Sequence, residues 1–200
     1  MRRSQEDTAE TRARIVAAAS RLLRARGIDA TSVADVMSAV GLTVGGFYRH
    51  FDSKEALVAE AIDSASRETA ARHPPTARAG GGADADTEAD LAALLDTYLS
   101  DAHRKQPGHG CPVAALCSEA GHGSKSTRKA FTAALERLLA SVDAALAPRA
   151  RGDRKDALFA TSAAVGALVL ARATHDDALA EELLSAVRER LLAGRGRGRV

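Results

Sequence analysis

Tryptophan is absent from this chain of 200 residues, and aromatic side chains make up only 3% of it. Strand-favouring residues are thin, whereas Ala and Leu, which are good helix formers, dominate. The composition therefore argues against a sheet-rich protein and favours an all-α fold. Proline is also scarce, and none of the five prolines precedes Pro74. Because proline interrupts helices, the first 73 residues can form long uninterrupted ones.

Cysteine is equally rare. Cys111 and Cys117 are too few for a disulfide framework, so a reducing compartment is expected. The N-terminus has no apolar signal core, and the longest charge-free run, between Asp156 and Arg172, is too short for a membrane span. We therefore expect a cytoplasmic protein with no membrane partner. The net charge of +2 does not itself indicate a nucleic-acid partner, but residues 1–54 carry nine basic and six acidic side chains.

Apolar residues recur at helical spacing along most of the chain and predict about nine helices. The expected helices end at Gly27 and Gly41 and then run over residues 44–50, 53–72, about 91–99, 113–120, 126–146, 153–174 and 176–193. Ser32 and Asp35 form a capping-box pattern at the start of the second helix. Residues 73–86, rich in Pro and Gly, predict a surface loop. The Arg-Gly tail, residues 194–200, is expected to be a disordered end.

One run stands apart from this scaffold: two helices, a glycine turn and a short helix rich in polar groups. The run reads Gly41-Leu42-Thr43-Val44-Gly45-Gly46-Phe47-Tyr48-Arg49-His50-Phe51. This order is typical of a helix-turn-helix, whose second helix enters the DNA major groove. Phe47 is expected in the core and its neighbour Tyr48 on the surface, because adjacent helical residues face different sides.

Residues 10–57 resemble the N-terminal domain of the tetracycline-repressor (TetR) family of transcriptional regulators. The likeness rests on the glycine-turn run above and on further matches at Ile15-Val16, Ala19, Leu22-Leu23, Gly27, Thr31, Val33-Ala34-Asp35-Val36, Ser53-Lys54-Glu55 and Leu57. The resemblance implies a homodimeric regulator, most often a repressor, that binds a near-palindromic operator and is released by a small molecule. It implies a DNA-binding domain over residues 1–53 and an effector-binding and dimerisation domain over 54–200.

The resemblance also implies roles for individual residues. Phosphate contacts would come from Thr43, Tyr48, His50 and Lys54, whose donors fix register without reading sequence. Base-facing positions would be Ala34, Val44, Gly45 and Gly46. Since these four lack hydrogen-bonding side chains, methyl contacts and Arg49 are expected to carry more of the specificity. Inert surface roles for His50 and Lys54 stay open.

The second half offers two expectations. The nearly charge-free helix 157–171 and the apolar stripe of the last helix predict a dimer seam, with an intrachain core as the alternative. The seam residues are Val165, Gly166, Val169, Leu183, Val187 and Leu191. An apolar effector pocket is expected from Leu95, Tyr98, Leu99, Leu116, Phe131 and Leu135.

Two alternatives concern the cysteines. Cys111, in a Gly-Cys-Pro helix start, invites a redox- or electrophile-sensing interpretation together with Cys117, since helix N-termini lower thiol pKa values. The spacing of the cysteines and nearby histidines matches no standard zinc-binding pattern. The remaining alternative is that both cysteines are small buried side chains with a structural role only. No hydrolase elbow, zinc-protease motif or phosphate loop occurs, so neither an enzyme nor a cofactor is expected.

Overall fold

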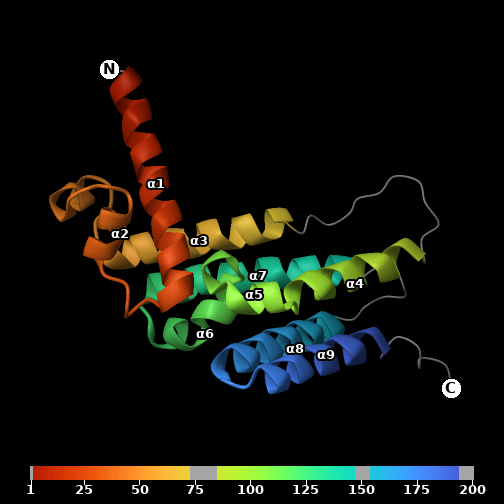
Figure 1. Ribbon diagram of the computed structural model, residues 1–200. Coiled ribbons are helices and arrows are strands. Elements are labelled where there is room, and N and C mark those ends of the chain that lie inside the picture. The colour runs from red at the N-terminus through yellow and green to blue at the C-terminus, as the bar shows by residue number, and fades with distance from the viewer. Residues whose placement is uncertain (1, 73–84, 147–153, 194–200) are drawn as a thin grey trace. The chain divides into compact units, whose positions relative to one another are not determined.

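The computed structural model describes residues 2–72, 85–146 and 154–193, and its regular structure in these ranges is helical, without a strand. The predicted all-α fold is confirmed (Figure 1). The α-helices are α1 Arg2–Arg26, α2 Val33–Ala39, α3 Lys54–Arg72, α4 Ala85–Tyr98, α5 Asp101–Lys105, α6 Pro112–His122, α7 Lys125–Leu146, α8 Arg154–Ala173 and α9 Asp177–Ala193. Two 3₁₀ helices, η1 Val44–Arg49 and η2 Pro107–His109, complete the order.

Two sequence expectations fall on other parts of the chain. Most of the expected loop, residues 73–84, lies outside the described residues, and its last two residues already belong to α4. The Arg-Gly tail, residues 194–200, lies outside them as well.

The chain divides into two compact units, Met1–Thr69 with Pro107–Leu135, and Ala70–Gln106 with Glu136–Val200. The division cuts α3 and α7, so each of these helices runs through both units. It groups α6 with the N-terminal helices because α6 packs against α1. The expected boundary after residue 53 does not coincide with this division into packing units, and it stays a prediction.

The core of the first unit forms where α1, α2, η1 and α3 meet. Phe47 is fully buried and stacks on Phe51 with ring centroids 5.4 Å apart. This pair pins η1, which is too short to be stable alone, to the longer helices. The buried apolar side chains around it are Ile15, Ala19, Leu23, Val36, Met37, Leu57, Val58 and Ile62.

Both glycine stops are confirmed by the backbone. Gly27 follows α1 with φ +93°, and Gly41 follows α2 with φ +74°. These left-handed values favour glycine, because a Cβ would clash with the backbone there. The two turns therefore fix the direction in which α2 and η1 leave the preceding helices.

Arg24 of α1 is a buried charge, because its side chain is only 1% exposed. It donates to the Ser20 carbonyl at 3.0 Å, to the Gly110 carbonyl at 2.8 Å and to the Glu68 carboxylate at 2.8 Å. The guanidinium group thus joins α1 to α3 and to the segment before α6. A buried arginine is tolerated because these bonds satisfy its donors.

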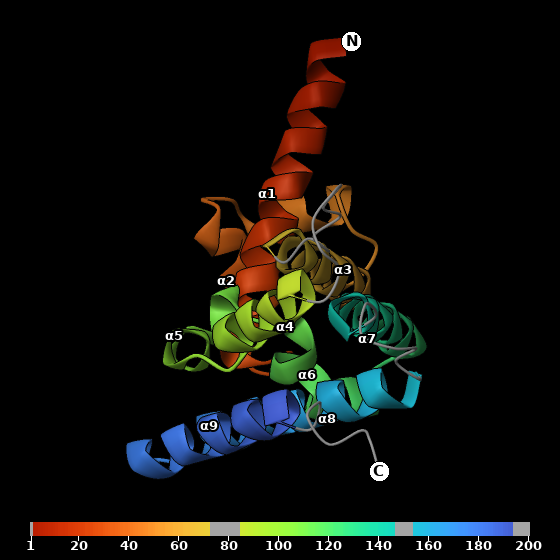
Figure 2. The same cartoon turned by 90° about the vertical axis from the view of Figure 1, so that its right-hand side faces the viewer.

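In the second unit, α8 and α9 lie antiparallel and side by side (Figures 1 and 2). Among the described helices, α8 is long and apolar enough by composition to cross a membrane. One side of it is buried against the rest of the unit. The buried cluster at this core is Val142, Ala157 and Ala160, packed against Leu94, Leu138, Leu146 and Leu191.

Candidate nucleic-acid interface

The first helix of the predicted helix-turn-helix, α2, begins with the expected capping box. The Asp35 amide donates to Ser32 Oγ at 3.1 Å, and the Ser32 amide donates to the Asp35 carboxylate at 2.8 Å. Hydrogen bonds from Ser32 lower the pKa of the Asp35 carboxyl below its usual value. The cap holds the start of α2 rigid, and Ala34 stands exposed in its first turn.

The end of α2 is fixed by its own turn and by α1. The Leu42 amide donates to the Met37 carbonyl at 2.9 Å across the Gly41 turn. Arg14 of α1 donates to the Val40 carbonyl at 3.0 Å, which satisfies a carbonyl left unpaired by the helix end. The turn is therefore held at both ends.

The second element, η1, has 3₁₀ geometry rather than the α-helix expected from sequence. Thr43 precedes it, exposed and without a side-chain capping bond. Val44 is 45% exposed, and nothing lies within 4 Å of a Cβ added to Gly45. A Cβ on Gly46 would touch only Met37 Cε, at 3.7 Å. The fold itself does not require these two glycines to lack side chains.

The aromatic pair behaves as predicted. Phe47 is buried, whereas Tyr48 is 71% exposed and meets Phe47 edge to face at 5.2 Å between ring centroids. The edge contact orients the Tyr48 ring while its phenol group stays at the surface. Leaving this aromatic ring exposed forgoes the free energy of burying it, and its oriented hydroxyl group suits a hydrogen-bond acceptor outside the protein.

The end of η1 is supported from α1. Arg12 lies 4.5 Å over the Phe51 ring, donates to the His50 carbonyl at 3.3 Å and forms a two-pronged ion pair with Glu60. Hydrogen bonding to Glu60 raises the pKa of the Arg12 guanidinium. Arg12 thus acts as a brace between α1, η1 and α3.

Arg49 and His50 differ in accessibility. Arg49 is exposed, whereas His50 is half-buried, and its Nδ1 is enclosed without a hydrogen-bond partner among the described residues. Any phosphate contact by His50 must therefore use Nε2.

Lys54 lies at the first position of α3 and is half-buried. Its Nζ donates to the Ile28 carbonyl at 2.8 Å. An ammonium group has three donors, so this bond leaves two for an outside anion. No local pattern marks this bond, because Ile28 lies 26 positions earlier in the chain.

The structure thus gathers Thr43, Val44, Gly45, Tyr48 and Arg49 on the exposed side of η1, and leaves Gly46, His50 and Lys54 half-buried. Sequence reasoning missed the residues that hold this surface in place. They are the arginine supports Arg12 and Arg14 and the carboxylate of Glu119, which accepts from the Ile28 and Asp29 amides at 3.0 and 3.1 Å.

The predicted effector-pocket residues fall into both units. Leu116, Phe131 and Leu135 belong to the first unit, and Leu95, Tyr98 and Leu99 to the second. Leu95 and Tyr98 line an apolar cavity between α4, α7 and α8, together with Leu91, Leu94, Leu138, Val142, Ala160, Thr161, Ala164 and Val165. The Thr161 hydroxyl is buried and has no hydrogen-bond partner among the described residues.

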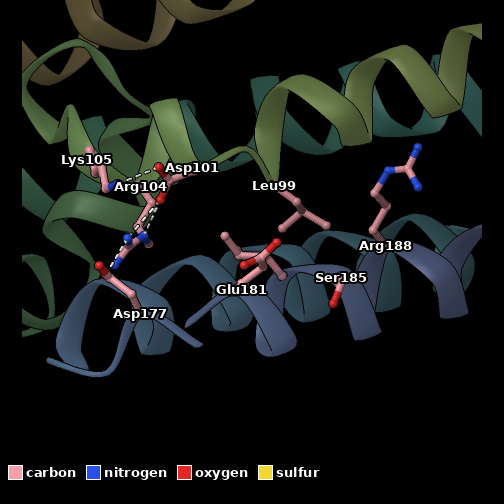
Figure 3. Close-up of a pocket in the computed structure, with 9 residues that line it drawn as sticks. Leu99, Asp101, Arg104, Lys105, Asp177, Glu181, Ser185 and Arg188 are labelled. Carbon is pink, nitrogen blue, oxygen red and sulfur yellow. Dashed lines mark hydrogen bonds and ion pairs between the residues drawn. The ribbon is translucent and has the colours of Figure 1, made fainter. Parts of the chain in front are cut away.

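Leu99 lines a different depression, a polar groove of about 400 Å³ against α9 (Figure 3). At one end of the groove Arg104 bridges Asp101 and Asp177, at 2.8 and 2.7 Å, and Lys105 pairs with Asp101. Hydrogen bonds to these carboxylates raise the pKa of the Arg104 guanidinium. The charges at this end compensate one another, so they give no preference for a ligand of either sign.

The predicted seam residues Val165, Gly166, Val169, Leu183, Val187 and Leu191 are all half-buried. Larger apolar side chains on the same helices are more open: Phe159 is 65% exposed, Leu170 57% and Leu179 44%. Together α8 and α9 present an apolar surface.

The two cysteines differ in access. Cys111 is 1% exposed at the N-cap of α6, and Cys117 is exposed. A buried thiol reacts slowly with electrophiles, which favours the structural interpretation of Cys111. Within the described ranges, no three His, Cys, Asp or Glu side chains come together as a metal site.

A capped helix, a glycine turn and an exposed second helix on an all-α scaffold define the class of helix-turn-helix regulators. The sequence profile described as "Bacterial regulatory proteins, tetR family" matches residues 15–61. The HTH-type transcriptional regulator TtgR of Pseudomonas putida is 42% identical over 64 residues, which are 32% of this chain and only 30% of TtgR. The HTH-type transcriptional regulator Rv0196 of Mycobacterium tuberculosis is 32% identical over 176 residues, covering 82% of this chain and 86% of that protein.

The fold agrees with these sequence matches. The crystal structure of a TetR transcriptional regulator from Chloroflexus aurantiacus superposes with a TM-score of 0.76 at 25% identity, covering 96% of this chain and 97% of the other. The chain belongs to the TetR family of transcriptional regulators. Members of this family are DNA-binding transcription factors and not enzymes.

Proposed function

We propose that this protein is a cytoplasmic dimeric repressor that binds a near-palindromic operator and is released by a small molecule. The observation that carries the proposal is the exposed side of η1, where Tyr48, 71% exposed, stands beside Thr43 and Arg49. Uncharged hydroxyls and a cation on one surface suit a phosphate backbone.

The contacts divide into two kinds. Thr43, Tyr48, His50 and Lys54 donate to phosphates, which positions η1 in the groove. Ala34, Val44, Gly45 and Gly46 face the bases, where small side chains allow close backbone approach. Arg49 supplies the strongest hydrogen-bond donors near these positions and reads a base edge.

The dimer forms through α8 and α9. Phe159, Leu170 and Leu179 are exposed on these helices, and the predicted seam residues are half-buried. Two of those, Val165 and Leu191, also pack toward the core of the same chain. Burying such a surface on a second copy is favourable at about 25 cal/mol per Å² of apolar area. A two-fold axis in turn matches two copies of η1 to the two halves of a palindrome.

The effector enters between α4, α7 and α8, where the apolar cavity of about 20 Å³ must widen to admit it. Its lining is aliphatic apart from Tyr98 and Thr161, so it suits a compact apolar molecule. The Thr161 hydroxyl, buried without a partner in the described part of the chain, supplies one polar contact. A ligand with a carbonyl or hydroxyl group at that point would satisfy it.

The test begins with selection of bound duplexes from a random pool, followed by titration of the selected operator at several salt concentrations. Tyr48→Phe should weaken binding about tenfold for each protomer and so about a hundredfold for the dimer, because it removes one hydrogen bond to a charged phosphate from each half-site. Its loss should be equal for operator and random DNA, and its salt slope unchanged, since no counterion is released by a phenol. Arg21→Ala, an exposed change on α1, is the matched control for a head-domain substitution. Unaltered affinity in Tyr48→Phe would exclude η1 as the DNA-binding surface.

A further inference from the structure

The loop that follows α1 is held by α6 through a single side chain. The Glu119 carboxylate of α6 accepts hydrogen bonds from the Ile28 amide at 3.0 Å and from the Asp29 amide at 3.1 Å. Each oxygen takes one amide, so the carboxylate fits two successive peptide groups. Both carboxylate oxygens of Glu119 therefore accept a hydrogen bond from the backbone that leads into α2.

Gly27, the residue before Ile28, leaves room for the Glu119 carboxylate. Gly27 has φ +93°, and a Cβ added there would lie 2.7 Å from Glu119 Oε1. A carboxylate near the C-terminus of a helix is disfavoured by the helix dipole. Glu119 occupies this place because the two amides outweigh that cost, so the contact is specific rather than a general charge preference.

Ile28 is also held from α3, through its carbonyl group. Lys54 Nζ donates to the Ile28 carbonyl at 2.8 Å, while Glu119 takes the Ile28 amide. Ile28 is thereby clamped between α6 and the start of α3. Since Lys54 follows η1 by a few residues and Ile28 precedes α2 by a few, the clamp reaches both sides of the helix-turn-helix.

The beginning of α6 is fastened separately to α1. Arg24 donates to the Gly110 carbonyl at 2.8 Å, and a Cβ on Gly108 would lie 3.3 Å from the Arg21 carbonyl. The N-terminal end of α6 is therefore fixed to α1, and Glu119 near its C-terminal end contacts the segment between α1 and α2. The chain continues from α6 into α7, whose Leu138 and Val142 line the apolar cavity.

We propose that Glu119 is a positioning residue for DNA binding, which fixes the start of the helix-turn-helix on α6 through the Ile28 and Asp29 amides. The inference rests on the proposed function and names a side chain of α6 that holds the DNA-binding surface in place. Glu119 itself touches no DNA. Its loss leaves the DNA-contacting side chains intact but lets the segment between α1 and α2 sample other conformations.

The experiment compares the full-length wild type with Glu119→Ala, Glu119→Gln and the control Asp143→Ala, which removes an exposed carboxylate from α7. Amide hydrogen exchange at Ile28 and Asp29 reports the clamp directly, and operator titration at several salt concentrations reports its effect. Glu119→Ala should speed exchange at both amides and weaken operator binding roughly tenfold, within the usual range of coupling between sites. The salt slope should not change, because no phosphate contact is lost.

Glu119→Gln keeps one accepting oxygen, so it should protect one amide and restore part of the affinity. It also serves if Glu119→Ala does not fold. Equal exchange at Ile28 and Asp29 in wild type and both variants would overturn the clamp. Faster exchange with unchanged operator affinity would overturn the positioning role. Wild-type protein that selects no duplex, yet shows the exchange difference, would instead refute the proposed DNA-binding function and leave the hydrogen bonds standing.

Discussion

From the contacts of the buried Arg24 guanidinium we predict how much its removal lowers the free energy of unfolding. In Arg24→Ala the carbonyl of Gly110 and the hydroxyl of Ser20 lose their donor inside the protein, and Glu68 loses its ion pair. Breaking a buried pair usually costs about 3–5 kcal/mol. Because the Glu68 side chain is 41% exposed and can be hydrated, we expect the lower end, about 3 kcal/mol.

That loss corresponds to a fall in Tm of about 6–12 °C for a chain of this size. Urea and thermal unfolding followed by circular dichroism, at one protein concentration, measure both quantities. Arg21→Ala is the matched control, since Arg21 lies on the same helix and is exposed, and it should change stability by less than about 0.5 kcal/mol. If Arg24→Ala and Arg21→Ala unfold alike, the argument that Arg24 joins α1 to the segment before α6 is refuted.

Two further predictions concern the helix cap and the dimer. Ser32→Ala should lower the free energy of unfolding by about 1 kcal/mol through loss of the cap. The folded pKa of Asp35 lies below its unfolded value, so its contribution is present above the unfolded pKa and disappears as pH falls through the folded one. The wild type should therefore lose more stability than Ser32→Ala between neutral and acidic pH, measured by urea unfolding; a parallel pH dependence would contradict this. Phe159→Glu should raise the dimer Kd roughly tenfold or more in sedimentation velocity, since exposed aromatics at a seam act as hot spots; an unchanged dimer would place the seam elsewhere.

Local features were predictable from the sequence because neighbouring residues determine them. The Ser32–Asp35 cap, the positive φ of Gly27 and Gly41, and the burial of Phe47 beside an exposed Tyr48 all follow from spacing of a few residues. The 3₁₀ geometry of η1 did not follow, since six residues with two glycines have no strong preference of their own.

Contacts between distant segments were not predictable. Arg24 and Gly110 are 86 positions apart, and Ile28 and Glu119 are 91 apart, so no local pattern marks either bond. Along α1 the buried Arg24 is chemically the same as the exposed Arg21 and Arg26. Likewise, an apolar stripe does not say which unit it packs in, and the predicted pocket therefore combined residues of both units.

The composition of η1 gives a last prediction, about how bases are read. Val44 is 45% exposed and Gly45 is open, while Ala34 is exposed in α2, so the proposed base-facing surface has no hydrogen-bonding side chain except Arg49. Methyl-to-methyl contact with thymine is then the main direct readout left to Val44 and Ala34. Replacing thymine by uracil in the selected operator removes that methyl and nothing else. Each contacted position should lose about 0.8 kcal/mol, roughly fourfold in affinity. At a thymine contacted by Val44, the same replacement should matter less in Val44→Ala, because the two γ-methyl groups of the valine are already gone. Equal losses at every position in wild type and Val44→Ala would mean that Val44 contacts no thymine. No loss at any position would mean that the bases are read through DNA shape instead.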